Sequence, residues 1–395
     1  MGYAMYQPLL GIKVVDFCLA GAGPSCTKLL SEYGADDILV EPLSGNSTRS
    51  VFKVDFYNTG KRCITLDLKT PEGMEVMLRL IEQADVFVSN YRKRALDRLD
   101  LTYERLSAIN PRLIYATLTG FGEEGPAADH PGYDPVAFWA RSGLMRDISD
   151  KDCLIPPPVA IGDIAAGQAL AGGICAALYQ RERTGRGERV YTSLLAEGVY
   201  LNHDAVVELQ YGERYPKTRL EPKRAMLNTY QCSDGNWIVI AGFELERHFW
   251  KLLEALGREN LVGDPRWKSI EDTMYQNAME VVGILDECFA QMTLDEAEAA
   301  LESIDFSYDR VQSTAEMMQD PQCINNQYIF QITAADGKNL IIPANPIKFT
   351  DKNSGTVNFK NGPRLGEHSM EILREYGYTE EEIRALLKKN ITSLG

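Results

Sequence analysis

The chain has 395 residues, and a typical domain length of about 150 residues favours two domains or one large α/β unit with an insertion. Hydrophobic residues make up 45% of the sequence and charged residues 25%, which excludes a chain that is disordered throughout. The 41 basic and 56 acidic side chains give a formal net charge of -15. This charge argues against a nucleic-acid or anionic-membrane binder, because both need a basic surface. A local basic pocket for a phosphorylated ligand is still compatible with it.

Cysteine and histidine are dispersed along the chain. No C-x-x-C pair occurs among the eight cysteines, and the four histidines show no metal-ligand spacing, so we expect no bound metal. The first residues lack a basic segment followed by an apolar core, so we expect no signal peptide. The most apolar stretch, residues 159–179, contains Asp163 and Gln168 and is rich in Ala and Gly, unlike a membrane span. We therefore predict a soluble, cytoplasmic protein.

Short β-branched runs alternate with helical segments in the first half of the chain. A helix is expected from Pro24 to Tyr33, and Thr70 followed by Pro71 marks the start of another. Strands separated by helices imply right-handed crossovers and a parallel sheet, so the predicted fold class is α/β. The predicted strands are residues 12–17, 37–41, 62–67, 85–89 and 113–118.

The pattern changes near residue 220. A hairpin is predicted at 229–241 with its turn at Asp234–Gly235, and a second hairpin turns at Asp336–Gly337. Capping boxes pair Thr293 with Glu296 and Thr379 with Glu382. We therefore place a smaller domain at 220–330, inserted into a larger domain formed by 1–219 and 331–395. The helices predicted within the smaller domain are residues 244–256, 275–292 and 293–302.

The turn after the first strand partly matches a dinucleotide-binding fingerprint. Gly21 and Gly23 form G-x-G, and Glu41 ends the second strand, but Cys26 replaces the third glycine and Pro24 lacks an amide. A tight strand–helix turn is therefore favoured over an NAD-dependent dehydrogenase. No G-x-S-x-G elbow of a serine hydrolase occurs. His203 and Asp204 are adjacent and are expected to point to different faces of a helix, which favours a surface or interface pair over a catalytic dyad.

A basic segment, residues 91–98, follows the predicted strand that ends at Ser89. The carboxyl edge of a parallel sheet is where α/β folds bind ligands. Lys61, Arg62 and Lys69 are expected to add positive charge at the neighbouring strand, so that together these residues bind a phosphorylated ligand. A solvated helix face is the alternative, and composition does not decide between the two.

Asp163 begins an Ala/Gly-rich helix after an apolar run. The helix dipole and free amides are expected to keep a carboxylate in the first turn ionised, and an ionised, open carboxylate can serve as a nucleophile. Gly167, Gly172 and Gly173 each cost about 1 kcal/mol relative to Ala, which suggests a close approach by another chain or a bulky ligand. Simple helix capping by Asp163 is the alternative, and spacing alone favours it.

These segments resemble the family III CoA-transferases, a group that includes formyl-CoA, carnitine and phenyllactate CoA-transferases. The likeness covers nearly the whole chain, and its blocks occur in the same order. They include AGPSCTKLLSEYGADDILVEP, NTGKRCITLDLKTPEG, ADVFVSNYRKRALDRL, GYDPVAFWARSG, GDIAAGQALAGG, NTYQCSDGNWIVIA, DPQC and LGEH.

The resemblance implies a Rossmann-like parallel-sheet domain with an inserted smaller α+β domain, in a homodimer whose chains interlock. It implies that Asp163 is the nucleophile and that coenzyme A is bound by Lys69 of the L-D-L-K block and by Asn90, Arg92 and Arg98 in and after the N-Y-R block. Tyr133 of the G-Y-D block is expected to lie along the pantetheine arm. The substrates are an acyl-CoA and a carboxylic acid, and no metal or permanently bound cofactor is implied.

The reaction implied is exchange of CoA between two acids through an aspartyl anhydride and an aspartyl-CoA thioester. The wording AFWARSG is closest to the 2-hydroxyacid and aryl-lactate branch of anaerobic amino-acid fermentation. Carnitine, bile-acid or dicarboxylate CoA-transferases and 2-methylacyl-CoA racemases are alternatives within the family, and a non-catalytic CoA-binding protein is one outside it. The chain departs from the formyl-CoA enzymes because it lacks their run of glycines around residues 226–235.

Overall fold

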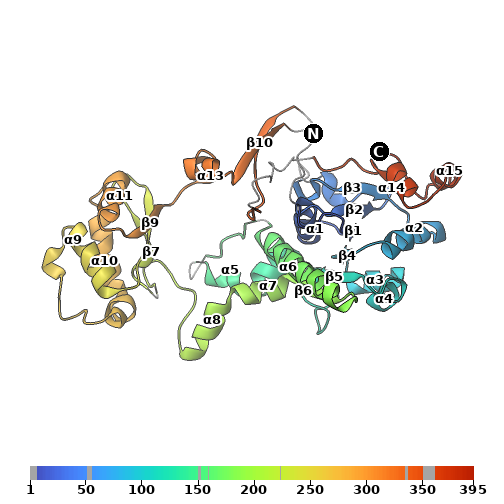
Figure 1. Cartoon of the computed structure of the whole chain (residues 1–395). Helices are drawn as coiled ribbons and strands as arrows, with labels where there is room; N and C mark the ends of the chain where they lie inside the picture. Colours follow the sequence, from blue (N-terminus) through green and yellow to red (C-terminus); the bar gives the residue numbers. More distant parts are fainter. Residues whose placement is uncertain are drawn as a thin grey trace. The chain divides into compact units, whose positions relative to one another are not determined.

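The computed structural model describes residues 7–50, 56–149, 153–158, 160–222, 224–333, 337–349 and 361–395. The chain divides into two compact units (Figure 1). The larger unit comprises Met1–Met145, Pro156–Val207 and Gln327–Gly395, and the smaller comprises Arg146–Ile155 and Glu208–Asn326. The predicted domain boundaries, at 219/220 and 330/331, stay a prediction.

A six-stranded parallel sheet forms the centre of the larger unit, in the order β3-β2-β1-β4-β5-β6. This is a doubly wound order whose direction reverses between β1 and β4. The α/β prediction is therefore confirmed, and β6 is a strand that the sequence analysis did not identify. The strands are β1 Lys13–Phe17, β2 Asp36–Glu41, β3 Arg62–Thr65, β4 Val86–Ser89, β5 Ile114–Thr119 and β6 Arg189–Ser193.

Helices cover both faces of this sheet. Side chains alternate between the two faces along each strand, so a strand can contribute apolar side chains to the core on both sides. Val14 packs on the face under α1 and α6, whereas Val15 and Phe17 pack on the opposite face. Figure 1 shows α1 and α6 on one side and α2, α3 and α4 on the other. The first layer contains α1 Ala22–Glu32, the π-helical turn η3 Pro135–Ala140, α6 Ile161–Thr184 and α7 Leu194–Leu201. The second contains α2 Pro71–Glu82, α3 Lys93–Leu99, α4 Tyr103–Ile109, α14 Ser369–Glu375 and α15 Glu380–Lys388.

The remaining elements of the larger unit are short. They are η1 Ser47–Ser50 and η2 Phe56–Asn58, while α5 Leu144–Asp147 and α8 His203–Glu208 each span a boundary between the units. Strands β10 Ile329–Thr333 and β11 Asn339–Pro343 pair antiparallel, which confirms the second hairpin. Asp336 of its predicted turn lies outside the described residues. Among those residues, α6 is the one helix long and apolar enough to cross a membrane, yet it packs on α1 as a core helix does.

The C-terminal segment covers the edge strand β3. The amide of His368 donates to the carbonyl of Cys63 at 3.0 Å, and the amide of Asp67 donates to the carbonyl of Ile391 at 2.8 Å. Arg62 forms ion pairs with Asp36, Glu371 and Glu375. Covering an edge strand in this way blocks pairing with another chain. The expectation that Arg62 contributes to a phosphate site was therefore wrong, because its charge is used to attach the C-terminal helices.

The smaller unit is built on an antiparallel sheet of β7 Leu227–Gln231, β8 Trp237–Ala241 and β9 Ser307–Arg310. The predicted hairpin at Asp234–Gly235 is confirmed, with Gly235 at φ +85°. Strand β9 was missed because Ser-Tyr-Asp-Arg is short and polar. The helical segments are η4 Leu209–Tyr211, η5 Leu245–Trp250, α9 Lys251–Ala255, η6 Glu259–Leu261, η7 Asp272–Gln276, α10 Ala278–Phe289, α11 Leu294–Glu302, α12 Thr314–Met317 and α13 Pro321–Asn325.

Local signals placed most helix starts well. Thr70 caps α2 by accepting the amide of Gly73, and the Thr293/Glu296 and Thr379/Glu382 capping boxes are both present. The predicted helix 244–256 differs in detail, because its first part, η5, is π-helical. The helix expected from 275 begins at Ala278, after the π-helical turn η7. These caps could be predicted from the sequence because each involves residues only three positions apart.

A buried ion pair links β1 to the segment before β3. The ammonium of Lys61 lies 2.9 Å from Asp16 Oδ2, and both side chains are fully buried. Lys61 also donates to Thr27 Oγ1 of α1 at 2.7 Å and to Asn58 Oδ1 at 2.9 Å. Burial, and after it the Asp16 carboxylate, raises the pKa of Asp37 on β2. The expectation that Lys61 binds a phosphorylated ligand was wrong, because its donors are directed to Asp16, Thr27 and Asn58.

Replacing Lys61 by Met should destabilise the protein strongly, because it leaves the Asp16 carboxylate buried without its cation. Breaking a buried pair from one side costs about 3–5 kcal/mol, and we expect K61M to lower the free energy of unfolding by that amount in urea denaturation followed by circular dichroism. The control K93M removes an exposed cation that pairs with Asp97, so its cost should be below about 1 kcal/mol. Equal losses in the two variants would contradict a stabilising role for the Lys61 pair.

Candidate active site

Asp163 lies in the first turn of α6, at the carboxyl edge of the parallel sheet. The helix runs from this edge back to the start of β6, so its first residues lie near the ends of the other strands. A Cβ atom added to Gly21, the residue directly before α1, would lie 2.2 Å from Asp163 Oδ2. The carboxylate therefore rests directly on the Gly21 backbone, and a glycine is needed at this position to admit it.

Helices α1 and α6 begin together at this point. Gly21 faces Asp163, and one helical turn further on Ser25 faces Gly167, where an added Cβ would lie 2.7 Å from Ser25 Cβ. The two helices therefore run in the same direction, with their N-termini at Asp163. Close approach at Gly167 comes from α1 of the same chain, rather than from the other chain or ligand that the sequence suggested. Gly173 meets Val190, and Gly172 has no such neighbour.

A second carboxyl, Asp134, supports the first turn of α6. Its side chain is 3% exposed, and its Oδ1 accepts the amide of Gly162 at 3.1 Å. Tyr57 of η2 is also buried nearby, since burial and then the charges of Asp163 and Asp134 raise its pKa. The sequence analysis missed both residues. Asp134 stands in the quoted G-Y-D block beside Tyr133 and could have been found there, whereas no pattern marks Tyr57.

The environment of Asp163 favours its protonated form. Burial first, and the Asp134 charge second, raise the pKa of Asp163 to about 7. The sequence analysis expected the helix dipole to keep this carboxylate ionised, and that expectation was wrong in direction. A dipole at a helix start contributes at most about 2 kcal/mol, and here removal from water together with a like charge outweighs it. The group is nevertheless ionised in a substantial fraction of molecules near neutral pH.

The residues predicted to bind CoA occupy different environments. Asn90, at the end of β4, accepts the amide of Leu19 at 2.9 Å and donates to its carbonyl at 2.6 Å, so it ties β4 to β1 where the sheet order reverses. Arg92 is exposed and donates to the carbonyl of Asp129 at 3.0 Å. Tyr133 is 62% exposed and immediately precedes Asp134. Lys69 and Arg98 are exposed. Neither is bonded to Asp163 among the contacts of the described residues.

Two alternatives from the sequence can be compared with the geometry. Glu41, the residue that would hold a nucleotide ribose, is buried, pairs with Arg49 and accepts the amide of Asn46 at 3.0 Å. Its carboxylate is thus already engaged. His203 and Asp204 are both exposed, and their side chains lie 3.3 Å apart, so the expectation that they point to different faces was wrong. Their exposure is that of a surface pair.

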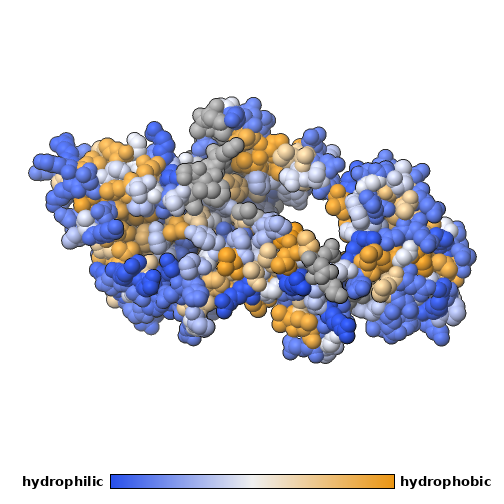
Figure 2. Space-filling model, turned by 180° about the vertical axis from the view of Figure 1, so that it is seen from behind, coloured by the Kyte–Doolittle hydropathy of each residue, from blue (hydrophilic) through white to orange (hydrophobic). Residues whose placement is uncertain are grey.

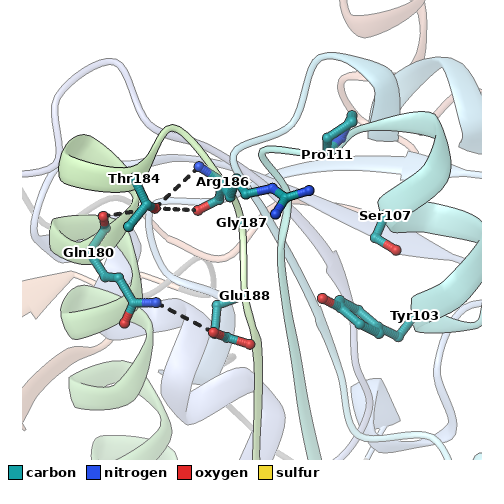
Figure 3. A pocket seen from close by; sticks show the side chains of 8 residues that line it. All are labelled: Tyr103, Ser107, Pro111, Gln180, Thr184, Arg186, Gly187 and Glu188. Atoms are coloured by element: carbon teal, nitrogen blue, oxygen red, sulfur yellow. Dashed lines mark hydrogen bonds between the residues drawn. The ribbon is translucent and has the colours of Figure 1, made fainter.

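A pocket of about 420 Å³ lies at the other end of α6 (Figure 3). Gln180 and Thr184 come from the last turns of this helix, and Gln180 donates to Glu188 across the pocket at 3.4 Å. At 1.5 Å per residue, the helix places Thr184 roughly 30 Å from Asp163. The pocket contains none of the predicted site residues and is separate from the Asp163 site. Its lining is Tyr103, Ser107, Pro111, Gln180, Thr184, Arg186, Gly187 and Glu188.

Ionisation of Asp163 should reduce folding stability. Its pKa rises from 3.8 to about 7 on folding, so stability falls as pH increases between these values, by at most about 4 kcal/mol. Asp163→Asn removes the titrating group, and we expect the variant to unfold at a higher temperature than wild type at pH 8. The difference should shrink toward zero near pH 4 in scanning calorimetry. A difference that stays constant over this range would contradict the raised pKa.

Comparisons with known proteins agree with the resemblance seen in the sequence. The model of CoA-transferase family III matches residues 9–369. The chain is 33% identical over 389 residues to (R)-2-hydroxy-4-methylpentanoate CoA-transferase of Clostridioides difficile, covering 95% of this chain and 97% of that protein. It is 30% identical over 396 residues to cinnamoyl-CoA:phenyllactate CoA-transferase of Clostridium sporogenes, covering 96% and 95% of the two chains.

A solved structure gives the same result for the fold. The crystal structure of a CAIB/BAIF family protein from Brucella suis matches with a TM-score of 0.76 at 31% identity, covering 94% of this chain and 100% of that chain. The match therefore extends over the parallel sheet and the smaller antiparallel sheets alike. Sequence, fold and relatives lead to one assignment: the chain belongs to CoA-transferase family III and is an enzyme of the kind that acts on CoA thioesters.

Proposed function

We propose that this enzyme moves CoA between an acyl-CoA and a free carboxylic acid, with Asp163 as the nucleophile. The observation that carries the proposal is the position of the Asp163 carboxylate, which lies against Gly21 where the N-termini of α1 and α6 meet. A carboxylate needs no general base once it is ionised, and two helix N-termini favour negative charge beside it.

The reaction proceeds through two covalent forms of Asp163. The carboxylate attacks the acyl carbonyl of the donor, which forms a mixed anhydride and releases CoA thiolate. The thiolate attacks the aspartyl carbonyl, which forms the aspartyl-CoA thioester and frees the donor acid. The acceptor carboxylate then attacks this thioester, giving a second anhydride and thiolate. Attack of the thiolate on the acceptor carbonyl yields the new acyl-CoA and restores Asp163.

The backbone around Gly21 is suited to stabilise the oxyanions of these steps. The first amides of a helix have no partner within the helix. In α1 these include the amides of Ala22 and Gly23, which follow the glycine that touches Asp163. Amides held at fixed positions stabilise a developing oxyanion without reorganisation. We assign them this role. Pro24 has no backbone N–H, so the series of amide donors is interrupted after Gly23.

CoA is proposed to bind to the larger unit, at the carboxyl edge of its sheet. The exposed cations Lys69, Arg92 and Arg98 are available for its phosphates, and exposed Tyr133 next to Asp134 is suited to contact the pantetheine arm. Asn90 holds the turn from which these contacts are made, through its two hydrogen bonds to Leu19.

The acids are proposed to be a 2-hydroxy acid or an aryl-lactate and enoyl-acid pair of anaerobic amino-acid fermentation. Two relatives that are similar over nearly the whole chain carry names of this kind, one acting on 2-hydroxy-4-methylpentanoate and one on cinnamoyl-CoA and phenyllactate. At 30–33% identity the support extends to the class of acid rather than to one compound. The free energy of the thioester is conserved in such an exchange. We also propose that the enzyme is located in the cytoplasm with its CoA substrates.

The enzyme is further proposed to act as an interlocked homodimer. Apolar side chains remain exposed along α6, α7 and α8, and Figure 2 shows apolar areas on the surface of the single chain. Large exposed apolar areas mark interaction sites in soluble proteins. A second copy of the chain would cover it. The exposed side chains are Ile161, Ile164, Tyr179, Val199, Tyr200, Leu201, Val206 and Val207.

Replacing Asp163 by Ala should abolish exchange of CoA between acids. The assay is mass spectrometry of the protein and its products after incubation with acyl-CoAs and free acids, including phenyllactate, 2-hydroxyisocaproate and cinnamate. We expect wild type to carry CoA or acyl adducts on Asp163, and the variant to carry none. Asp204→Ala, which removes an exposed carboxylate, should remain active. Exchange by D163A would refute the role of Asp163, and α-proton exchange without CoA transfer would indicate a racemase instead.

Gly21→Ala should lower the rate of transfer. An added Cβ would lie 2.2 Å from Asp163 Oδ2 and would displace the carboxylate, and a displacement of about 1 Å costs on the order of 100-fold in rate. In Gly283→Ala, at an exposed position of α10, the added Cβ meets no atom within 4 Å, so activity should be unchanged and stability about 1 kcal/mol higher. Steady-state kinetics of both variants test this, and a wild-type rate in G21A would disprove the contact.

A further inference from the structure

The site contains a second carboxyl group that the reaction scheme does not use. Asp134 precedes η3, is 3% exposed, and lies beside the first turn of α6. Carboxylates are rarely buried without a purpose, because removing the charge from water is costly. A buried carboxylate next to a proposed carboxylate nucleophile therefore calls for a functional explanation.

We propose that Asp134 is a positioning residue, which holds the first turn of α6 in place and sets the pH range in which Asp163 is an active nucleophile. This inference rests on the proposed role of Asp163. Asp134 is given no chemical step of its own, and it acts on the reaction only through the backbone that carries Asp163 and through its charge.

Asp134 acts first through a contact with the backbone of α6. Asp134 Oδ1 accepts the amide of Gly162, the residue directly before Asp163, at 3.1 Å. A Cβ on Gly162 would lie 2.3 Å from this oxygen and 2.2 Å from the Phe138 ring, so only glycine fits between them. Ala160 just before has φ +69°, a conformation that disfavours residues other than glycine. Asp134 thus holds a strained entry into the helix, and the direction of the Asp163 side chain depends on it.

Asp134 also acts on Asp163 through its charge. Asp134 and Tyr57 are the titratable groups that interact with Asp163 from η3 and η2, while α1 presents Gly21 and Ser25, which carry no charge. Glu197 is a carboxyl on α7, the other helix of this layer, and burial alone raises its pKa. Burial raises the pKa of Asp134, and the amides of Ala160 and Gly162 act in the opposite direction by favouring its charged form. When Asp134 is ionised, its negative charge lies beside Asp163 and makes the nucleophile more basic.

A more basic carboxylate is a better nucleophile once it is ionised, because reactivity follows basicity. The same upward shift of the Asp163 pKa also leaves a smaller fraction of this carboxylate ionised at low pH. Asp134 therefore links rate to pH: transfer is expected to fall with decreasing pH near 7, the value about which Asp163 titrates, well above the range usual for an aspartate. Without Asp134, the fall would occur at lower pH.

Asp134→Asn separates the two effects. Asparagine keeps an oxygen that accepts the Gly162 amide but has no charge, so we expect the acidic limb of the pH profile of kcat/KM to move to lower pH by about one unit. The rate at pH 5.5, relative to the rate at pH 8, should rise by up to about tenfold. Asp134→Ala also loses the hydrogen bond, so its kcat should fall at every pH while KM for acyl-CoA changes little. Glu197→Gln removes a partly buried carboxyl on α7 and should leave the profile in place.

The outcomes distinguish this inference from the proposed function. An unchanged pH profile in D134N, with D163A inactive, would overturn the role of Asp134 and leave the role of Asp163 intact. An active D163A would instead refute the proposed nucleophile. Should D134N fail to fold, D134A provides the test, because it lacks the same charge, and formation of the Asp163 adduct measured against pH should begin at lower pH than in wild type. An acidic limb that is unchanged in D134A would overturn the inference.

Discussion

The close packing of α1 on α6 is the constraint on which the site depends. Gly21 and Gly167 remove the side chains that would separate the two helices, and Asp163 and Ser25 occupy the space opposite them. Because the two contacts lie one turn apart on each helix, they also determine that the helices run in the same direction. The nucleophile proposed here, and the amides proposed to serve it, are therefore positioned by the same contacts that build one layer of the core.

The electrostatics of the site balance two opposing effects. Helix N-termini favour a negative charge, whereas burial and Asp134 disfavour it, and the second pair of effects dominates at Asp163. Such an arrangement reduces folding stability, as is common where a reactive group must be exposed to substrate but not to water. It is also consistent with the proposed nucleophile needing no histidine as a base, since a carboxylate with a pKa near neutrality is both available and reactive.

Buried and clustered charges elsewhere in the larger unit serve architecture. Lys61 and Asp16 join β1, α1 and the segment before β3, and Arg62 attaches the C-terminal helices to the edge of the sheet. Asn90 links β1 and β4 at the point where the strand order reverses. Of these, the Asn90 hydrogen bonds to Leu19 lie at the carboxyl edge of the sheet, next to the turn that carries Gly21.

The sequence by itself determined the parallel α/β class, the hairpin at Asp234–Gly235, the capping boxes and the start of a helix near Asp163, because each depends on residues a few positions apart. The tertiary structure alone decided which cations are free. Lys61 and Arg62 stand in sequence beside exposed Lys69, yet their partners come from β1, β2 and a C-terminal helix. It also decided the direction of the pKa shift at Asp163 and the part played by Asp134. Burial and charge pairing join residues that are distant along the chain, and no local pattern records which of them will meet.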